Sequence, residues 1–232
     1  MVVQQPHPAE DSGSNPTPPL QFSRCSLADV TAFVKEHHYT HSHMATNVLY
    51  CFRIDVSGVL SGAALFGNMA GNPKASCVME GHDDPHEYQE LCRLVLLDEL
   101  PKNSESRFIG WCLRWLKKNT SLVALISFAD PSRGHSGVIY HATNWVYCGL
   151  QKQDRNRLIV DGKDIHPRYL YNLYGTSSVK KLREKGLVVE ELPRQPKHRF
   201  VFPLREGLVI KKRLFNGQKE ETDWTDEIGV ST

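Results

Sequence analysis

The sequence predicts an α/β protein in which helices flank a mixed central sheet and a basic C-terminal extension follows. Two apolar runs, at residues 88–98 and 122–130, have the Leu- and Val-rich composition of central strands covered on both faces. Between them, residues 108–116 repeat aromatic and aliphatic side chains at helical spacing. Strands and helices in this order are typical of a mixed α/β sheet.

The other elements have local signals. Ser26 and Asp29 form a capping-box-like start for a helix at 26–37. Residues 47–67 carry β-branched and aromatic runs on either side of the turn at 55–58, which predicts a β-hairpin. After the second buried strand we expect a short helix at 139–144 and strands at 145–151 and 156–161.

The composition favours one folded domain with additions at its ends. The 232 residues are 40% hydrophobic and 23% charged, which argues against a disordered or fibrous class. No apolar run reaches the ~18 residues that a membrane-spanning helix needs. We expect a disordered leader at 1–20, a catalytic α/β domain at 21–163, a basic and aromatic extension at 164–216 and a flexible tail at 217–232. The six cysteines lack a C-x-x-C pair, so we expect reduced thiols and a cytosolic location.

The densest group of proton-handling side chains lies at residues 128–145. Asp130 ends a buried strand, and this is the edge at which open α/β sheets bind ligands. Tyr140 and two histidines follow within a few turns of chain. We interpret this stretch as functional, with the alternative that Asp130 and Pro131 only form a turn.

The segment from Glu90 to Ser106 is a second candidate. Arg93 lies within an apolar strand, where an unpaired charge is costly, so we expect Asp130 or a bound anion as its partner. Asn103 and Ser106 stand at the start of the next helix, where hydroxyls and backbone N–H groups can hold a phosphate or carboxylate. Ordinary helix capping is the alternative.

Four histidines occur in EHHYTHSH, residues 36–43. His37 and His41 would share a helix face only if the helix continued to residue 41, and we expect it to end earlier. Proton transfer or substrate hydrogen bonding is therefore favoured slightly over metal binding. If a metal binds, we expect one or two of these histidines and Asp130 to hold it, with His41 and His43 as bystanders.

Residues 165–204 carry eight basic against three acidic residues, with five aromatic residues interleaved. Basic groups neutralise phosphates and aromatic rings stack on bases, so the segment has the composition of a nucleic-acid surface. A small subdomain with an aromatic core and solvated lysines is an equal alternative. The residues expected to contact nucleic acid are Arg168, Lys180, Lys181, Arg183, Lys185, Lys197 and Arg199.

Three stretches, at 88–118, 125–150 and 197–204, resemble the Mom family of DNA-modification proteins from bacteriophages such as Mu. The pattern D-x-x-x-G-H-x-G-x-I-Y-x-A-T-N-W at 130–145 is the most specific part, and the resemblance covers roughly residues 22–204. It implies a GCN5-related N-acetyltransferase (GNAT) fold and conversion of adenine in double-stranded DNA to N6-carbamoylmethyladenine. It further implies protection of phage DNA from restriction in the host cytoplasm, acetyl-CoA and iron as cofactors, and no membrane partner.

The resemblance also implies site residues. The catalytic set would be His38, Tyr39, Arg93, Asp130 and Tyr140. Acetyl-CoA would lie against Arg93, Asn103, Ser104, Ser106 and Arg107, and iron would bind His38 and Asp130. GNAT enzymes hold the CoA pyrophosphate with a glycine-bearing loop, but residues 97–108 contain no glycine. An aminoacyl-tRNA therefore stays open as an alternative donor and a further partner.

The expected reaction needs the adenine to be flipped out of the duplex into a pocket lined by Tyr39, Tyr140 and Trp145. His38 or Asp130 would take the N6 proton, and Arg93 would hold the donor. Two alternatives remain at this point. One is a GNAT-like acyltransferase acting on a small molecule or protein, and the other is a phage DNA-binding protein without catalytic activity.

Overall fold

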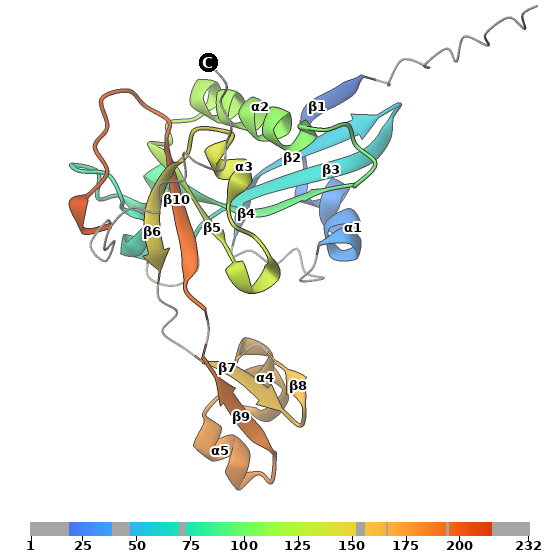
Figure 1. The fold of residues 1–232 in the computed structure, drawn as a ribbon, viewed down its shortest axis with the longest axis vertical. Coiled ribbons are helices and arrows are strands. Elements are labelled where there is room, and N and C mark those ends of the chain that lie inside the picture. The colour runs from blue at the N-terminus through green and yellow to red at the C-terminus, as the bar shows by residue number, and fades with distance from the viewer. Residues whose placement is uncertain are drawn as a thin grey trace, which may run out of the picture.

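The computed structural model describes residues 19–38, 47–69, 73–151, 156–165, 167–193 and 195–214. Nearly all of the expected leader and the whole expected tail lie outside these ranges. The described residues form a seven-stranded sheet with helices on its faces, and a smaller three-stranded sheet (Figure 1). In the part of the chain that is described, no helix combines the length and apolar character needed to cross a membrane.

The N-terminal half of the large sheet is an antiparallel series with one helix. Its elements are β1 (Leu20–Cys25), α1 (Leu27–His37), β2 (Val48–Val56), β3 (Val59–Gly67) and β4 (Tyr88–Leu96). The predicted capping box is present, since the Ser26 backbone N–H donates to the Asp29 carboxylate over 2.7 Å. The predicted hairpin is also confirmed, and Ser57 and Gly58 both have positive φ, as a tight hairpin turn requires. Strand β1, at the edge beside β2, was not predicted.

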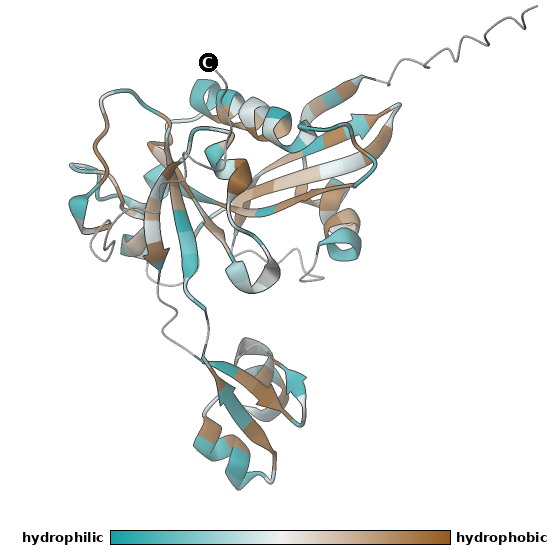
Figure 2. Cartoon of the chain, viewed as in Figure 1, coloured by the Kyte–Doolittle hydropathy of each residue, from teal (hydrophilic) through white to brown (hydrophobic). Residues whose placement is uncertain are grey.

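After β4 the chain forms α2 (Ser104–Asn119) and then β5 (Ala124–Ala129), which runs parallel to β4. Both predicted central strands and the helix between them are confirmed. Helix α2 packs its apolar stripe against the face of β3 that carries Ala64 and Phe66. Helix α1 packs against the opposite face, which carries Ala63 and Leu65. The two helices thus cover the two faces of the sheet, as expected for strands this apolar (Figure 2).

The last strands of the large sheet come from distant parts of the chain. They are β6 (Val146–Gln151) and β10 (Lys197–Pro203), in the order β1-β2-β3-β4-β5-β10-β6. Between β5 and β6 the chain forms a 3₁₀ turn, Pro131–Arg133, and the short helix α3 (Val138–His141), close to its predicted place. Residues 197–203 were assigned to the basic extension and no strand was predicted there, but they form β10, which pairs with both β5 and β6. Its central residues Phe200 and Val201 are fully buried, so it completes the core.

The remaining elements form what we call the small unit, the described residues of 156–193, which lies beyond the ends of β6 and β10 (Figure 1). It contains β7 (Arg157–Val160), β8 (Lys163–Asp164), α4 (Pro167–Tyr174), α5 (Val179–Glu184) and β9 (Val189–Leu192). Leu158, Leu170 and Leu182 are among the residues of its own hydrophobic core. The expected domain boundary between residues 163 and 164 falls within β8.

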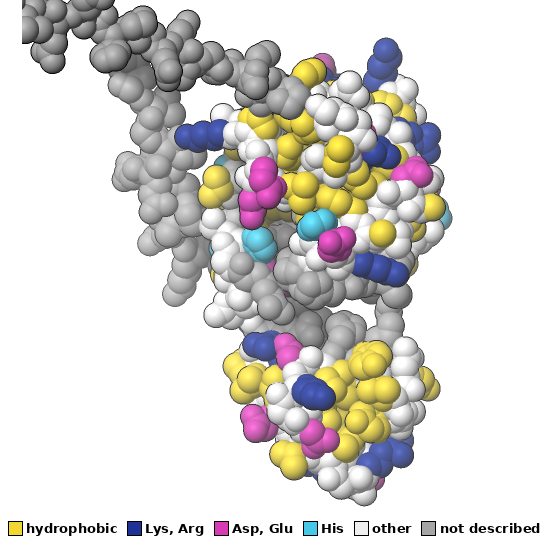
Figure 3. Space-filling view, turned by 90° about the vertical axis from the view of Figure 1, so that its right-hand side faces the viewer, with side chains coloured by type: hydrophobic (Ala, Val, Ile, Leu, Met, Phe, Trp, Pro, Cys, Tyr) yellow, Lys and Arg dark blue, Asp and Glu magenta, His cyan; other side chains and the backbone are white. Residues whose placement is uncertain are grey.

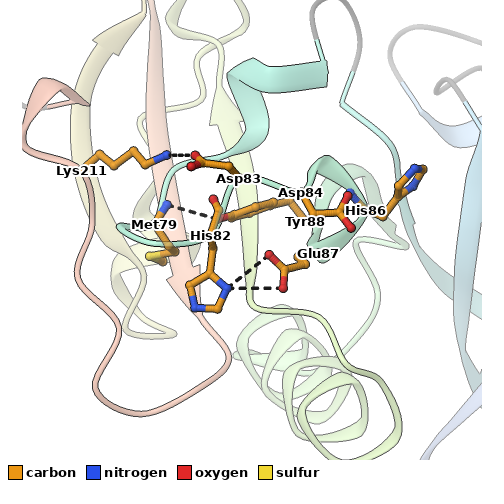
Figure 4. A network of polar contacts seen from close by, with 8 residues as sticks. All are labelled: Met79, His82, Asp83, Asp84, His86, Glu87, Tyr88 and Lys211. Carbon is orange, nitrogen blue, oxygen red and sulfur yellow. Dashed lines mark hydrogen bonds and ion pairs between the residues drawn. The ribbon is translucent and has the colours of Figure 1, made fainter.

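A polar network joins the loop before β4 to the C-terminal segment (Figure 4). The Tyr88 hydroxyl donates to the His82 carbonyl over 2.9 Å, and burial raises the pKa of Tyr88 to about 12. His82 faces the Glu87 carboxylate, and Lys211 reaches Asp83 over 2.6 Å. The ion pair between Lys211 and Asp83 connects this loop to the C-terminal segment. The raised pKa keeps the Tyr88 phenol neutral near pH 7. Short 3₁₀ turns at Pro73–Ser76, Pro85–Glu87 and Lys212–Leu214 belong to the same region.

All six cysteines are free thiols. Burial raises the pKa of Cys51 and of Cys148 to about 11, so both are neutral near pH 7.

Candidate functional site

A pocket of about 720 Å³ opens where the pairing of β4 with β5 ends. The two strands pair only from Tyr88 to Glu90 and from Ala124 to Ile126. Beyond these residues the strands separate, and side chains from both line the pocket together with the start of α2 and residues 134–142. The β-strand contribution to the lining is Leu91, Cys92, Leu94, Leu96, Phe128 and Ala129. The pocket therefore occupies the opening between two strands of one sheet.

Six of the predicted site residues line this pocket. They are His38, Asn103, Ser104, Ser106, Asp130 and Tyr140. These come from three stretches of sequence about 25 residues or more apart, so the fold brings the predicted groups together. Tyr39, and the bystanders His41 and His43, lie outside the described residues.

His38 is the pocket histidine of the His37/His38 pair. It directly follows α1, where its backbone N–H donates to the Val34 carbonyl over 3.0 Å, and its side chain is buried. His37 instead packs its ring 4.6 Å from that of Phe33 and lies near Glu36. Helix α1 ends at His37, before residue 41, as predicted.

Tyr140 is the most firmly held group of the pocket. Its ring stacks on Phe200 with 4.8 Å between centroids, and Trp145 meets it at 5.2 Å edge to face. Its hydroxyl lies 2.7 Å from Ser127 Oγ. Trp145, which we expected to line the pocket, packs instead between Tyr140 and Phe202 in the core and does not belong to the lining.

Asp130 is held as an anion. Its Oδ1 accepts from the Ser132 backbone N–H and hydroxyl over 3.0 and 2.6 Å, and its Oδ2 lies 3.4 Å from Lys197 Nζ. Burial by itself raises the pKa of Asp130, but the hydrogen bonds from Ser132 and the charge of Lys197 outweigh it and lower the pKa below its usual value. A carboxylate stabilised in this way is a weak base near neutral pH.

Asp130, one of the two partners expected for Arg93, is paired with other residues. The carboxylate is engaged by Ser132 and Lys197, and one Arg93 N–H donates to the Cys92 carbonyl over 2.6 Å. Arg93 lies directly opposite Leu65 in the sheet, on the face covered by α1, and is not part of the pocket lining. Side-chain alternation puts Leu94 on the opposite face from Arg93, and the register shift between Leu65 and Phe66 puts Leu91, which pairs with Phe66, on that opposite face as well.

The start of α2 presents its first turn to the pocket. Asn103 has a left-handed backbone (φ 67°) and makes no capping hydrogen bond with its side chain. The hydroxyls of Ser104 and Ser106 donate to the carbonyls of Pro101 and Asn103 over 2.5 and 3.0 Å. The hydroxyls are therefore occupied, and the uncapped helix terminus is the feature suited to an anionic cofactor group. Arg107 is exposed and lies outside the pocket lining.

Metal binding receives no support from the described residues, among which no three His, Cys, Asp or Glu side chains are grouped to hold an ion. His38 and Asp130 do both line the pocket.

The residues predicted to bind nucleic acid fall into two groups. Lys197 and Arg199 belong to β10 in the large sheet, and Arg199 donates to the carbonyls of Cys148 and Leu214 over 3.3 and 3.0 Å. Arg199 thus connects β10 to β6 and to the C-terminal segment. The others belong to the small unit, where Lys180, Lys181 and Lys185 are exposed and Arg183 donates to the Val189 carbonyl over 2.8 Å. Arg168 lies in α4.

The face of the small unit in Figure 3 has hydrophobic side chains with both basic and acidic ones beside them. Its exposed large apolar residues include Tyr169, Tyr171 and Leu173 of α4. Aromatic and basic side chains are thus both accessible on this unit.

Sequence reasoning missed Ser127, a buried residue in the middle of β5 that contacts the Tyr140 hydroxyl. One signal was available: Ser127 is the single hydroxyl residue in the apolar run 122–129.

The sequence matches both a protein family and an individual protein. The sequence profile of the Mom protein family matches residues 19–219. The methylcarbamoylase Mom of Escherichia phage Mu is 32% identical over 147 residues, which are 61% of this chain and 57% of the phage Mu protein. The match therefore spans little more than half the length of that relative.

Solved structures that are similar to this one include two acetyltransferases. The ribosomal-protein-S18-alanine N-acetyltransferase of Escherichia coli has a TM-score of 0.46 at 9% identity, over 82% of this chain and 99% of its own. The putative acetyltransferase yncA of Salmonella typhimurium, solved with its cofactor acetyl-CoA, has a TM-score of 0.49 at 10% identity, over 83% of this chain and 98% of its own.

Proposed function

Because the chain belongs to the Mom protein family, we propose that it modifies adenine in DNA to N6-carbamoylmethyladenine and thereby shields phage DNA from restriction. The observation that carries this proposal is the extent of the family match, residues 19–219, which includes every residue that lines the pocket. The phage Mu relative, named a methylcarbamoylase, supports the same chemistry.

The size and position of the pocket suit a flipped base and a donor group together. At about 720 Å³ it lies within the range of roughly 300–1,000 Å³ usual for small-molecule sites. The N6 amine of adenine is inaccessible inside a duplex, so the base must leave the stack to react. Apolar strand residues at the floor and Tyr140 would face the base, and the start of α2 would face the donor.

Among the pocket residues, we assign the proton transfer to His38. The N6 amine must lose a proton as its new bond to carbon forms, and an imidazole is suited to accept it near neutral pH. Asp130 is less suited, since Ser132 and Lys197 stabilise its charged form. Its role would be to hold Lys197 at the pocket, where the ammonium can meet a phosphate or a donor carbonyl.

The atoms of the product limit which molecules can donate the added group. The added group consists of a methylene, a carbonyl and an amide nitrogen, whereas an acetyl thioester contains no nitrogen. Acetyl-CoA therefore needs a nitrogen source and a two-electron oxidant, and iron held by His38 and Asp130 would mediate that oxidation. A glycyl ester such as glycyl-tRNA has the atoms of the added group already and needs only transfer and rearrangement. The first turn of α2, with Asn103, Ser104 and Ser106, would hold a phosphate of either donor.

The small unit would bind the DNA backbone. Lys180, Lys181 and Lys185 are exposed on or next to α5, and Tyr169 and Tyr171 are exposed on α4. Such a surface contacts phosphates without reading sequence, and it would keep the duplex near the pocket.

Mass spectrometry of nucleosides from bacteria that express the chain tests the proposal. We expect carbamoylmethyl-deoxyadenosine with the wild-type chain and little of it with His38→Ala or Tyr140→Phe. Unmodified adenine beside abundant, folded wild-type protein would overturn the proposal and favour a DNA-binding protein without catalytic activity. Modified adenine formed in a purified reaction with acetyl-CoA, a nitrogen source, iron and an oxidant, free of tRNA, would exclude the tRNA donor.

A further inference from the structure

Ser127 occupies the point at which the large sheet opens into the pocket. The last paired residues of the two parallel strands are Glu90 and Ile126, and the next residues along the strands are Leu91 and Ser127. Ser127 is 1% exposed, and its Oγ lies 3.2 Å from the Leu91 carbonyl oxygen and 2.7 Å from the Tyr140 hydroxyl. One buried hydroxyl therefore links β4, β5 and α3 by contacting two residues that line the pocket, Leu91 and Tyr140.

Ser127 is a hydrogen-bond partner of the Tyr140 hydroxyl, while aromatic neighbours hold the Tyr140 ring. The ring is held by Phe200 at 4.8 Å on its face and by Trp145 at 5.2 Å, which fixes its plane. Gly137, one turn before it, lies directly against the Phe200 ring, so the backbone of α3 is also close to β10. The aromatic contacts fix the ring, and the contact of 2.7 Å between Ser127 Oγ and the phenol oxygen constrains the direction of the hydroxyl group.

The two partners of Ser127 differ in chemistry. The Leu91 carbonyl can only accept, whereas the Tyr140 hydroxyl can donate or accept, and Ser127 has a single proton. When Ser127 donates to Leu91, it can accept from Tyr140, and when Tyr140 needs a donor, Ser127 can rotate toward it. Ser127 can thus follow a change in the hydrogen bonding of Tyr140 without leaving a buried hydroxyl unsatisfied.

We propose that Ser127 is a positioning residue for Tyr140, which orients the phenol hydroxyl toward the group that reacts in the pocket. The inference rests on the proposed function for the reaction itself, but the placement of the hydroxyl can be measured without it. A purely structural serine, which only satisfies the Leu91 carbonyl, would affect folding and would act independently of Tyr140.

The first measurement is spectroscopic. In protein labelled with ¹³C at the ζ carbon of tyrosine, Ser127→Ala should shift the Tyr140 resonance, which reports on the hydrogen bonding of the phenol. The resonance of Tyr88, whose hydroxyl binds the His82 carbonyl, should stay in place and serves as the control. An unmoved Tyr140 resonance in folded Ser127→Ala protein would overturn the proposal, whether or not the chain modifies DNA.

The second measurement is a double-mutant cycle on adenine modification in cells, at matched levels of folded protein. We expect Ser127→Ala to lower modification about tenfold, the size of one lost hydrogen bond, and to leave unchanged the residual modification quantified in the Tyr140→Phe background. Equal losses in both backgrounds would show that Ser127 does not act through Tyr140. If Ser127→Ala does not fold, Ser127→Cys keeps the size with a weaker donor, and the same two readouts apply. Absence of modified adenine in the wild type would remove the proposed function, while the resonance shift still decides the placement of Tyr140.

Discussion

The ring of Phe200 lies where a side chain on Gly137 would begin. A Cβ atom built on Gly137 would be 2.4 Å from Phe200 Cζ, and the glycine has φ +90°. Phe200 belongs to β10 and Gly137 stands at the start of α3, so this contact seats the helix that carries Tyr140 on the large sheet. A glycine is needed here for both the space and the backbone conformation.

Gly137→Ala should lower the free energy of unfolding by about 2–4 kcal/mol, because overpacking and a positive φ both disfavour alanine. Chemical denaturation measures the change. Gly134→Ala is the matched control, since its φ is +74° but nothing lies within 4 Å of a Cβ there. It should lose only the conformational part, about 1 kcal/mol. Equal losses for the two variants would contradict the role of the Phe200 contact.

The capping box of α1 should be measurable in the same way. Ser26→Ala removes the hydroxyl that accepts from the Asp29 backbone N–H over 3.3 Å, and should lower the free energy of unfolding by about 1 kcal/mol. Ser178 stands at the start of α5 without a side-chain capping bond, so Ser178→Ala should lower it by clearly less. A larger loss at Ser178 than at Ser26 would be inconsistent with this account.

The ion pair between Lys197 and Asp130 should give stability that depends on pH. Since the folded state lowers the pKa of Asp130, this stability is fully present above the unfolded value of about 3.9 and is lost as pH falls through the folded value. Lys197→Met should therefore be less stable than wild type at pH 7, and the difference should shrink on acidification. Lys118→Met, at an exposed position on α2, is the control and should show no such trend. A difference that is constant with pH would exclude this coupling.

The basic surface of the small unit should contribute to DNA affinity through phosphates. Lys180→Glu should weaken binding to duplex DNA of any sequence and reduce the slope of log affinity against log salt by about 0.9, the value for one lost phosphate contact. Fluorescence anisotropy over a salt series measures both. Lys118→Glu makes the same change of charge on α2 of the large sheet. If the two variants lose affinity equally, net charge rather than the small unit governs binding.

Several site residues were predictable because they follow local signals. Asp130 stands at the end of an apolar strand and His38 at the end of a capped helix, and both signals span only a few neighbouring residues. The fold does place both in the pocket. Arg93 was misplaced because the sequence shows that it lies in a strand but not which face of the sheet the pocket adjoins.

The sequence alone determined helices α1 and α2, the hairpin and the two central strands, since capping, turn geometry and side-chain periodicity act over short distances. Helices α4 and α5 of the small unit were not predicted. Only the tertiary structure decided the place of β10 between β5 and β6, and the point at which β4 and β5 separate. Both depend on pairing between residues distant in sequence. That pairing brings Phe200 and Ser127 to Tyr140, and it makes a pocket out of residues that no local pattern connects.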